Sequence, residues 1–162
     1  MKAPLRPVAL PPGAPGRLLL SAMPGRFDPL PTFLASAAAA GVSRVASLAD
    51  PAEIALKSPD YAAARASGAL PFPVIDHPVR DYGAPADPAA FAAFVEDLAG
   101  SLRRGETVAI HCAAGIGRTG LAAQRVLQAL GLDADEAAAR VRAAGSQPET
   151  AAQRDFLGGE EK

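Results

Sequence analysis

Hydrophobic and polar positions follow two alternating patterns along the chain, which predict short strands separated by helices. Apolar runs of strand length lie at 17–22, 43–48, 72–75 and 107–111. Between them, apolar residues recur at helical spacing, and several such stretches start with Pro and stop at Gly. The expected helices are Leu30–Ala40, a short one from Pro51, Pro59–Ser67, one from Pro88 to Leu102, one through Leu121–Leu130, one capped by Asp133, and a last one opened by Ser146 and Glu149. This alternation predicts one α/β domain with a mainly parallel sheet covered by helices on both faces.

The two ends of the chain lack these patterns. Residues 1–16 contain five prolines, which cannot enter the interior of a helix or a sheet. We expect an irregular surface arm there. Residues 17–158 form the expected domain, and residues 159–162 a frayed tail.

Composition narrows the class of protein. A hydrophobic content of 49% over 162 residues suits one compact domain with a core. The 16 basic and 17 acidic residues nearly cancel, so we expect no nucleic-acid or membrane partner. No apolar stretch has the form of a signal peptide or a membrane span. Cys112 is the single cysteine, which excludes a disulfide within the chain and favours the reducing cytoplasm.

Cys112 lies where a predicted strand ends and a predicted helix begins. If the following loop curls, its backbone N–H groups converge on one point, and the helix N-terminus adds partial positive charge. A phosphate would fit there, and Arg118 can donate two hydrogen bonds to its oxygens. The same donors would favour the thiolate of Cys112, which is the nucleophilic form. The predicted phosphate-binding residues are Ala113, Ala114, Gly115, Ile116, Gly117 and Arg118.

Other interpretations of this loop are weaker. Residues 115–120 match the G-x-G-x-x-G of dinucleotide-binding folds, but Asp133 and Asp135 open a helix where that fold needs a strand with an acidic end. The P-loop of nucleotide hydrolases needs Gly-Lys-Ser/Thr, which does not occur. Cys112 as a small buried filler leaves the complete motif around it unexplained.

The string His111-Cys112-x-x-Gly115-x-x-Arg118-Thr119 resembles the signature of the cysteine-dependent protein tyrosine phosphatase superfamily. The resemblance implies that Cys112 attacks phosphorus, that Arg118 binds the phosphoryl oxygens and that Thr119 assists breakdown of a phosphocysteine intermediate. His111 would orient the loop and help to keep the sulfur ionised. The resemblance also implies that no metal ion and no cofactor is needed.

A general acid is expected in the turn-rich segment 76–87. A phosphate ester needs its leaving oxygen protonated, and an acid on a mobile loop can do this. Asp81 lies 31 positions before Cys112, at the spacing that the resemblance implies. Asp76 is the alternative, because loop insertions change such spacings, whereas Asp87 is explained as a helix cap.

The resemblance extends over most of the chain. Residues 20–25 (LSAMPG) and 77–85 (HPVRDYGAP) are similar to the small dual-specificity-like branch, of the kinase-associated phosphatase type. This similarity implies a four- or five-stranded, mainly parallel sheet flanked by helices. Residues 149–153 (ETAAQ) resemble the family's Gln-Thr-x-x-x-Gln region, with Glu149 in place of the first glutamine. Gln153 would then help to position the hydrolytic water.

These observations predict a phosphomonoester hydrolase that acts through a phosphocysteine. The variable loop positions Ala113, Ala114 and Ile116 carry no charge, which favours a phosphorylated protein or peptide over polyphosphorylated inositols. Phosphotyrosine is the expected substrate, with phosphoserine and phosphothreonine left open, and phosphate, sulfate or vanadate should bind in the loop. The alternatives are a phosphatase of phosphoinositides or other small phosphate esters, and a non-catalytic phosphate-binding module.

Overall fold

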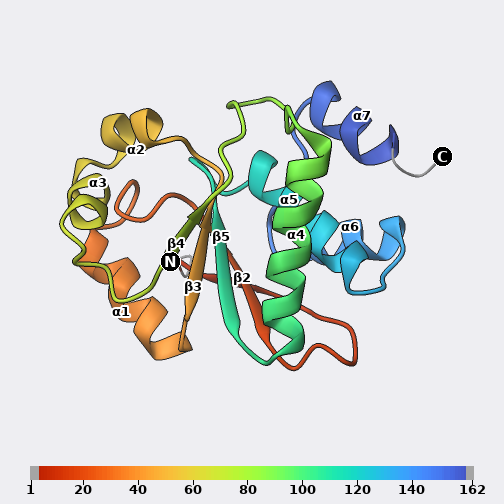
Figure 1. Cartoon of the computed structure of the whole chain (residues 1–162), viewed down its shortest axis with the longest axis horizontal. Coiled ribbons are helices and arrows are strands. Elements are labelled where there is room, and N and C mark those ends of the chain that lie inside the picture. The colour runs from red at the N-terminus through yellow and green to blue at the C-terminus, as the bar shows by residue number, and fades with distance from the viewer. Residues whose placement is uncertain (1–3, 160–162) are drawn as a thin grey trace.

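The computed structural model describes residues 4–159, in which five strands and seven helices alternate (Figure 1). The strands are β1 (Arg6–Val8), β2 (Arg17–Ser21), β3 (Arg44–Ser47), β4 (Val74–Asp76) and β5 (Thr107–His111). The helices are α1 (Leu30–Ala40), α2 (Pro51–Lys57), α3 (Pro59–Ala66), α4 (Pro88–Arg103), α5 (Gly117–Ala129), α6 (Ala134–Ala143) and α7 (Ala151–Gly159).

All five strands form one sheet in the order β1-β2-β5-β3-β4. Neighbouring strands from β2 to β4 run parallel, and β1 pairs antiparallel with β2 at one edge. The predicted α/β class with a mainly parallel sheet is therefore confirmed.

The expectation of an irregular arm at residues 1–16 is wrong for the part that forms β1. This strand pairs with Leu18–Leu20. Pro7 is tolerated in it because an edge strand leaves part of its backbone without a partner in the sheet. Residues 1–3 lie outside the described part, as do residues 160–162 of the predicted tail, whereas Gly159 still belongs to α7.

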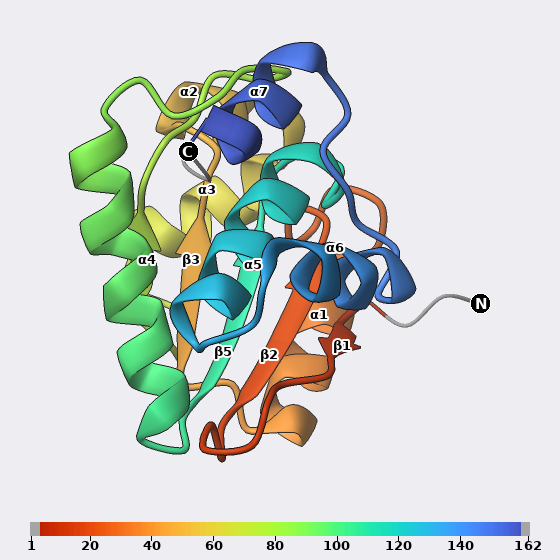
Figure 2. The ribbon, with the colours of Figure 1, turned by 90° about the vertical axis from the view of Figure 1, so that its right-hand side faces the viewer.

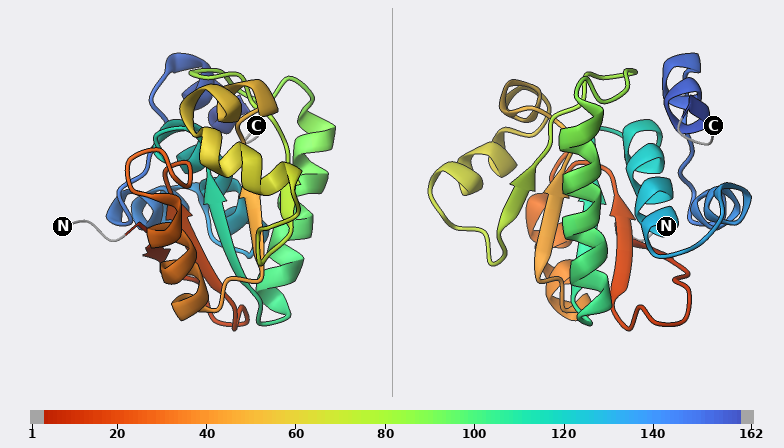
Figure 3. Two further views of the ribbon diagram at one scale, coloured as in Figure 1. Left: turned by 90° about the vertical axis from the view of Figure 1, so that its left-hand side faces the viewer. Right: turned by 45° about the vertical axis from the view of Figure 1, so that its right-hand side comes forward.

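Helices cover both faces of the sheet (Figures 1 and 3). The first three helices lie on one side and α4, α5 and α6 on the other. Strand residues alternate between the two cores: Leu18 and Leu20 join the core under α4 and α5, whereas Leu19 packs with Phe33 of α1. Within residues 4–159, no helix combines the length and the hydrophobicity needed to cross a membrane.

The carboxyl ends of the parallel strands meet at one edge of the sheet. Ser21 of β2 and Ser47 of β3 both lie in register with His111 of β5. Ligands bind at this edge in open parallel sheets. Cys112 follows the central strand, β5, and the segment expected to hold the acid runs from β4 to α4 along the same edge (Figure 2).

The last helix starts later than the sequence predicts. Its first residue is Ala151, and the cap is Thr150, whose hydroxyl accepts a hydrogen bond from the Gln153 N–H at 3.2 Å. The Ser146 hydroxyl, predicted as a cap, instead donates to the Gly115 carbonyl at 2.6 Å. Ser146 therefore contacts the loop after Cys112.

Candidate active site

The loop between β5 and α5 turns three of its carbonyl groups outward. The pairs are the Ala113 carbonyl with the Met23 N–H (3.1 Å), the Gly115 carbonyl with the Ser146 hydroxyl (2.6 Å) and the Ile116 carbonyl with the Gln147 N–H (3.1 Å). No peptide bond in the described part is cis, so the N–H that follows each carbonyl points the opposite way. The N–H groups of Ala114, Ile116 and Gly117 therefore share the inner side of the loop, beside the N-terminus of α5.

Two glycines of the G-x-G-x-x-G pattern, Gly115 in this loop and Gly120 in α5, are needed for close packing. Gly115 has φ of +77°, and a Cβ there would collide with the Ser21 carbonyl. A Cβ on Gly120 would lie 2.6 Å from the Gln147 nitrogen. The G-x-G-x-x-G pattern is thus explained by contacts with β2 and with the segment before α7, without a dinucleotide.

The Cys112 sulfur is held by donors of its own loop. It accepts hydrogen bonds from the Gly115 N–H at 3.3 Å and from the Thr119 hydroxyl at 3.0 Å. Cys112 also lines a cavity of about 110 Å³ together with Asp81 and Arg118. Reactive thiols in proteins have such surroundings, with hydrogen-bond donors to the sulfur and a polar cavity beside it. This environment argues against Cys112 as a small buried residue that only fills space.

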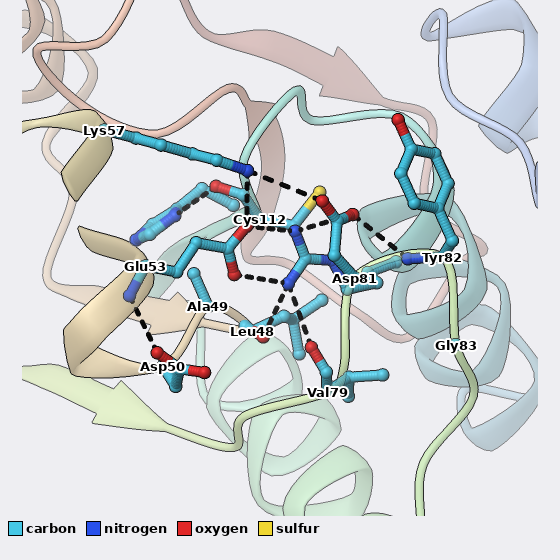
Figure 4. A network of polar contacts seen from close by, with 12 residues as sticks. Leu48, Ala49, Asp50, Glu53, Lys57, Val79, Asp81, Tyr82, Gly83 and Cys112 are labelled. Carbon is cyan, nitrogen blue, oxygen red and sulfur yellow. Dashed lines mark hydrogen bonds and ion pairs between the residues drawn. The ribbon is translucent and has the colours of Figure 1, made fainter.

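Arg118 is buried and its guanidinium is fixed by the carboxylate of Glu53, which Figure 4 labels together with Val79. Both oxygens of Glu53 accept hydrogen bonds from it at 2.8 Å, and the Val79 carbonyl accepts another at 2.9 Å. Such a two-pronged pair sets the plane of the guanidinium. The hydrogen bonds from Arg118, with a further one from Lys57, hold the pKa of Glu53 at about 2. Glu53 is therefore ionised near neutral pH.

Asp81 is the predicted acid that the structure brings to Cys112. One of its oxygens lies 3.2 Å from an Arg118 nitrogen. Asp76, the alternative, pairs with Arg65 at 2.6 Å and does not line the cavity. Asp87 caps α4, as predicted, by accepting a hydrogen bond from a backbone N–H of that helix. The geometry thus favours Asp81.

His111 is completely buried behind the loop. Its Nδ1 lies 3.0 Å from the Cys112 carbonyl, which can only accept, and its Nε2 lies 2.8 Å from the Tyr61 hydroxyl. Burial lowers the pKa of His111 to about 4. The ring is therefore neutral near pH 7, with its proton on Nδ1. His111 can orient the loop through the Cys112 carbonyl, and its neutral ring supplies no positive charge to the sulfur. That it helps to keep the sulfur ionised stays a prediction.

Gln153 lies at the cavity and joins α7 to the loop that carries Asp81. Its amide nitrogen donates to the Gly83 carbonyl at 3.1 Å, and its oxygen accepts from the Glu149 N–H at 2.7 Å. The Thr150 hydroxyl donates to the Tyr82 carbonyl at 3.0 Å. The sequence predicted Gln153 at the site, but not the contacts of Gln153 and Thr150 with the loop that carries Asp81.

Glu53, Lys57, Arg26 and Tyr82 belong to the site and were missed from the sequence. The only signal at Glu53 was its position three residues after Asp50, whose side chain accepts from the Glu53 N–H. That pattern explains the start of α2 and gives no sign of Arg118. The other three line the cavity from separate loops and helices, and no motif links them.

Comparison with known proteins agrees with this geometry. The sequence profile of the tyrosine phosphatase family matches residues 34–140. No curated protein sequence matches the chain.

Several solved structures share the fold. The kinase-associated phosphatase, with its catalytic-site cysteine replaced by serine, has a TM-score of 0.84 at 19% identity, covering 99% of this chain and 95% of its own. Tk-PTP in its active form has a TM-score of 0.70 at 24% identity, covering 93% and 97%. The human tyrosine phosphatase-like serine/threonine/tyrosine-interacting protein has a TM-score of 0.67 at 19% identity, covering 96% and 95%.

The family profile covers well over half of the chain, including Cys112 and Arg118. The fold, the loop after β5 and the donors around the sulfur agree with it. The chain therefore belongs to the tyrosine phosphatase family, and its site is that of a cysteine-based phosphatase.

Proposed function

We propose that the protein hydrolyses phosphotyrosine in proteins or peptides through a phosphocysteine on Cys112. One observation supports this most directly: the sulfur, the Arg118 guanidinium and the Asp81 carboxyl line the same small cavity. Nucleophile, phosphate binder and acid are thus within reach of one phosphoryl group.

In the first step, the Cys112 thiolate attacks phosphorus, and an S–P bond forms as the P–O bond to the substrate breaks. Asp81, in its protonated form, gives its proton to the leaving oxygen. The phosphoryl oxygens gain charge in the transition state. The inward N–H groups of the loop and the Arg118 guanidinium stabilise that charge, because they are already oriented.

In the second step, a water oxygen attacks phosphorus and the S–P bond breaks. The Asp81 carboxylate takes a proton from the water, and inorganic phosphate leaves. The Thr119 hydroxyl, 3.0 Å from the sulfur, stabilises the thiolate as it departs. Gln153, in the first turn of α7, lines the same cavity and positions the water.

The position of Tyr82 favours a substrate that carries an aromatic ring. Its ring is exposed beside the Asp81 carboxyl (Figure 4), and its backbone has φ of +61°, which non-glycine residues rarely adopt. An exposed aromatic side chain at the mouth of the cavity can pack against the ring of a phosphotyrosine.

A phosphatase of small phosphate esters, including phosphoinositides, is the second candidate. Lys57 and Arg26 both line the cavity, so the site has cations that the uncharged loop positions did not indicate. Lys57 is paired with Glu53 at 2.9 Å and with Asp81 at 3.4 Å, which offsets its charge. The balance favours a substrate with one phosphate.

Hydrolysis of p-nitrophenyl phosphate, with and without vanadate, tests the proposed activity. We expect vanadate-sensitive release of nitrophenol from the wild-type protein and none from Cys112→Ser. Binding of phosphate without hydrolysis would show a non-catalytic module and refute the proposal. Rates on matched phosphotyrosine and phosphothreonine peptides and on inositol phosphates then test the substrate, and fastest turnover of an inositol phosphate would favour the second candidate.

We also propose a cytoplasmic site of action. The nucleophile must stay reduced, and reducing compartments protect a reactive thiol that lines a cavity from oxidation. Fractionation of the source cells, followed by detection of the protein in the soluble cytoplasmic fraction, tests this proposal.

A further inference from the structure

Arg6 of β1 reaches the outer side of the loop after Cys112. One of its terminal nitrogens donates to the Gly115 carbonyl at 2.6 Å. The other donates to the Ala144 carbonyl at 2.6 Å and to the Ser146 hydroxyl at 3.0 Å. The guanidinium therefore joins the phosphate loop to the end of α6 and to the segment before α7.

These contacts fix the direction of one peptide group. The Gly115 carbonyl accepts from both Arg6 and Ser146, each at 2.6 Å, so both acceptor positions of this oxygen are used on the outer side. Because the peptide is trans, the Ile116 N–H must point to the inner side. A reversal of this peptide would break two short hydrogen bonds and replace an inward donor by a carbonyl oxygen, which repels an anion.

The charge of Arg6 also acts on the site. Burial lowers the pKa of Arg6, while interaction with the Cys112 sulfur raises it, so the two groups lie within each other's electric field. The buried groups beside the sulfur are Arg118, whose charge is shared with Glu53 and Asp81, and His111, which is neutral near pH 7. The other charged residues that line the cavity with Cys112 are Arg26, Lys57 and Glu149. Arg6 is paired with no carboxylate among the described residues, so its positive charge is not offset.

We propose that Arg6 is a positioning residue for phosphoryl transfer, which holds the Gly115–Ile116 peptide with its N–H toward the anion and adds positive charge behind the sulfur. The proposal rests on the proposed phosphatase function. It assigns a role in the site to β1, a strand from the segment that sequence analysis placed outside the domain.

Alkylation of Cys112 by iodoacetamide tests the proposal without requiring turnover. Cys112 is the only cysteine, so mass spectrometry of the intact chain follows this one thiolate as pH is varied. In Arg6→Met, the pH midpoint of alkylation should rise by about one unit, because a nearby cation is lost. Protection of the thiol by vanadate should need about tenfold more vanadate, because one backbone donor is no longer held in place.

Arg140→Met is the matched control. Arg140 also ties α6 to the N-terminal segment, by donating to the Ala9 carbonyl at 3.1 Å, but it does not contact the phosphate loop. This variant should lose thermal stability to a similar extent while its alkylation midpoint and vanadate protection stay at the wild-type values. Arg6→Lys keeps the positive charge but cannot donate from two terminal nitrogens. Its pH midpoint of alkylation should therefore lie closer to the wild-type value than its protection by vanadate does.

An unchanged midpoint and unchanged vanadate protection in folded Arg6→Met would overturn the proposal, and so would equal effects of the two methionine variants. If Arg6→Met does not fold, Arg6→Lys carries the test, and wild-type vanadate protection in it would overturn the positioning role. A wild-type protein that hydrolyses no phosphate ester would refute the proposed function, but the alkylation result would still decide whether Arg6 holds the loop.

Discussion

Replacing His111 by asparagine should remove an acid-sensitive part of the free energy of unfolding. The imidazole is fully buried between the Tyr61 hydroxyl and the Cys112 carbonyl. Protonation would place a charge in the interior and would turn the acceptor Nε2 into a donor that faces a hydroxyl. The folded state therefore holds the neutral ring, which is why the pKa of His111 falls to about 4.

The sign and size of the effect follow from proton linkage. In the unfolded chain the histidine has its ordinary pKa of 6.5, so below that pH the unfolded state binds a proton that the folded state refuses. The contribution of His111 to the free energy of unfolding should be complete above pH 6.5, decrease as the pH falls, and level off below the folded-state pKa of about 4. Between about pH 7.5 and about pH 5, the loss attributable to His111 is roughly 2 kcal/mol.

Urea unfolding of the wild type and of His111→Asn across this pH range measures the effect. The wild type should lose roughly 2 kcal/mol more unfolding free energy than His111→Asn between about pH 7.5 and about pH 5. This change does not depend on the difference between the two proteins at neutral pH. The chain has only one other histidine, His77, and partial burial lowers its pKa as well. His77→Asn is therefore the control that separates the acid dependence due to His77 from that due to His111. Parallel pH curves for the wild type and His111→Asn, or an imidazole proton signal from His111 that titrates near pH 6.5, would refute the reasoning.

Substitutions of Cys112, Asp81, Asp76 and Glu53 have separate expected outcomes. Cys112→Ser should lower turnover of p-nitrophenyl phosphate to background while inorganic phosphate still binds, as measured by calorimetry; measurable burst kinetics in this variant would contradict the nucleophile assignment. Asp81→Asn should reduce turnover about 100- to 1,000-fold and make it depend more steeply on the pKa of the leaving group, since general acid catalysis is lost. Asp76→Asn should keep near wild-type rates, and the reverse result would move the acid to Asp76. Glu53→Gln should lower turnover about 10- to 100-fold, because Arg118 loses the carboxylate that sets its plane, and an unchanged rate would show that the Val79 carbonyl suffices.

Local patterns in the sequence predicted the parts of the fold that depend on nearby residues. The buried strand at 107–111 and the helix from Pro88 were predicted because β-branched runs, proline at the first turn and an aspartate cap act within a few residues. The loop that holds Cys112 is also local, since the sulfur and its donors lie within residues 112–119. Its geometry could therefore be inferred from spacing alone.

Contacts between distant segments could not be inferred in the same way. Glu53 and Arg118 are 65 positions apart, and Arg6 and Gly115 are 109 apart. Neither pair leaves a periodic pattern, because each partner also has a local explanation: Glu53 lies in a capped helix turn, and Arg6 lies beside a proline that suggests an irregular arm. Only the structure shows that Glu53 contacts Arg118 and that Arg6 contacts Gly115.

This separation between local and distant contacts matters for how the site works. The loop by itself supplies N–H groups near a sulfur, but a loop of small residues and glycines has many conformations of similar energy. The outer contacts from Arg6 and Ser146 select the one in which the donors converge, and Glu53 does the same for the Arg118 side chain. Catalysis by oriented dipoles requires that orientation before the substrate arrives. Substitutions at these supporting residues should therefore impair turnover even though none of them contacts the reacting phosphorus.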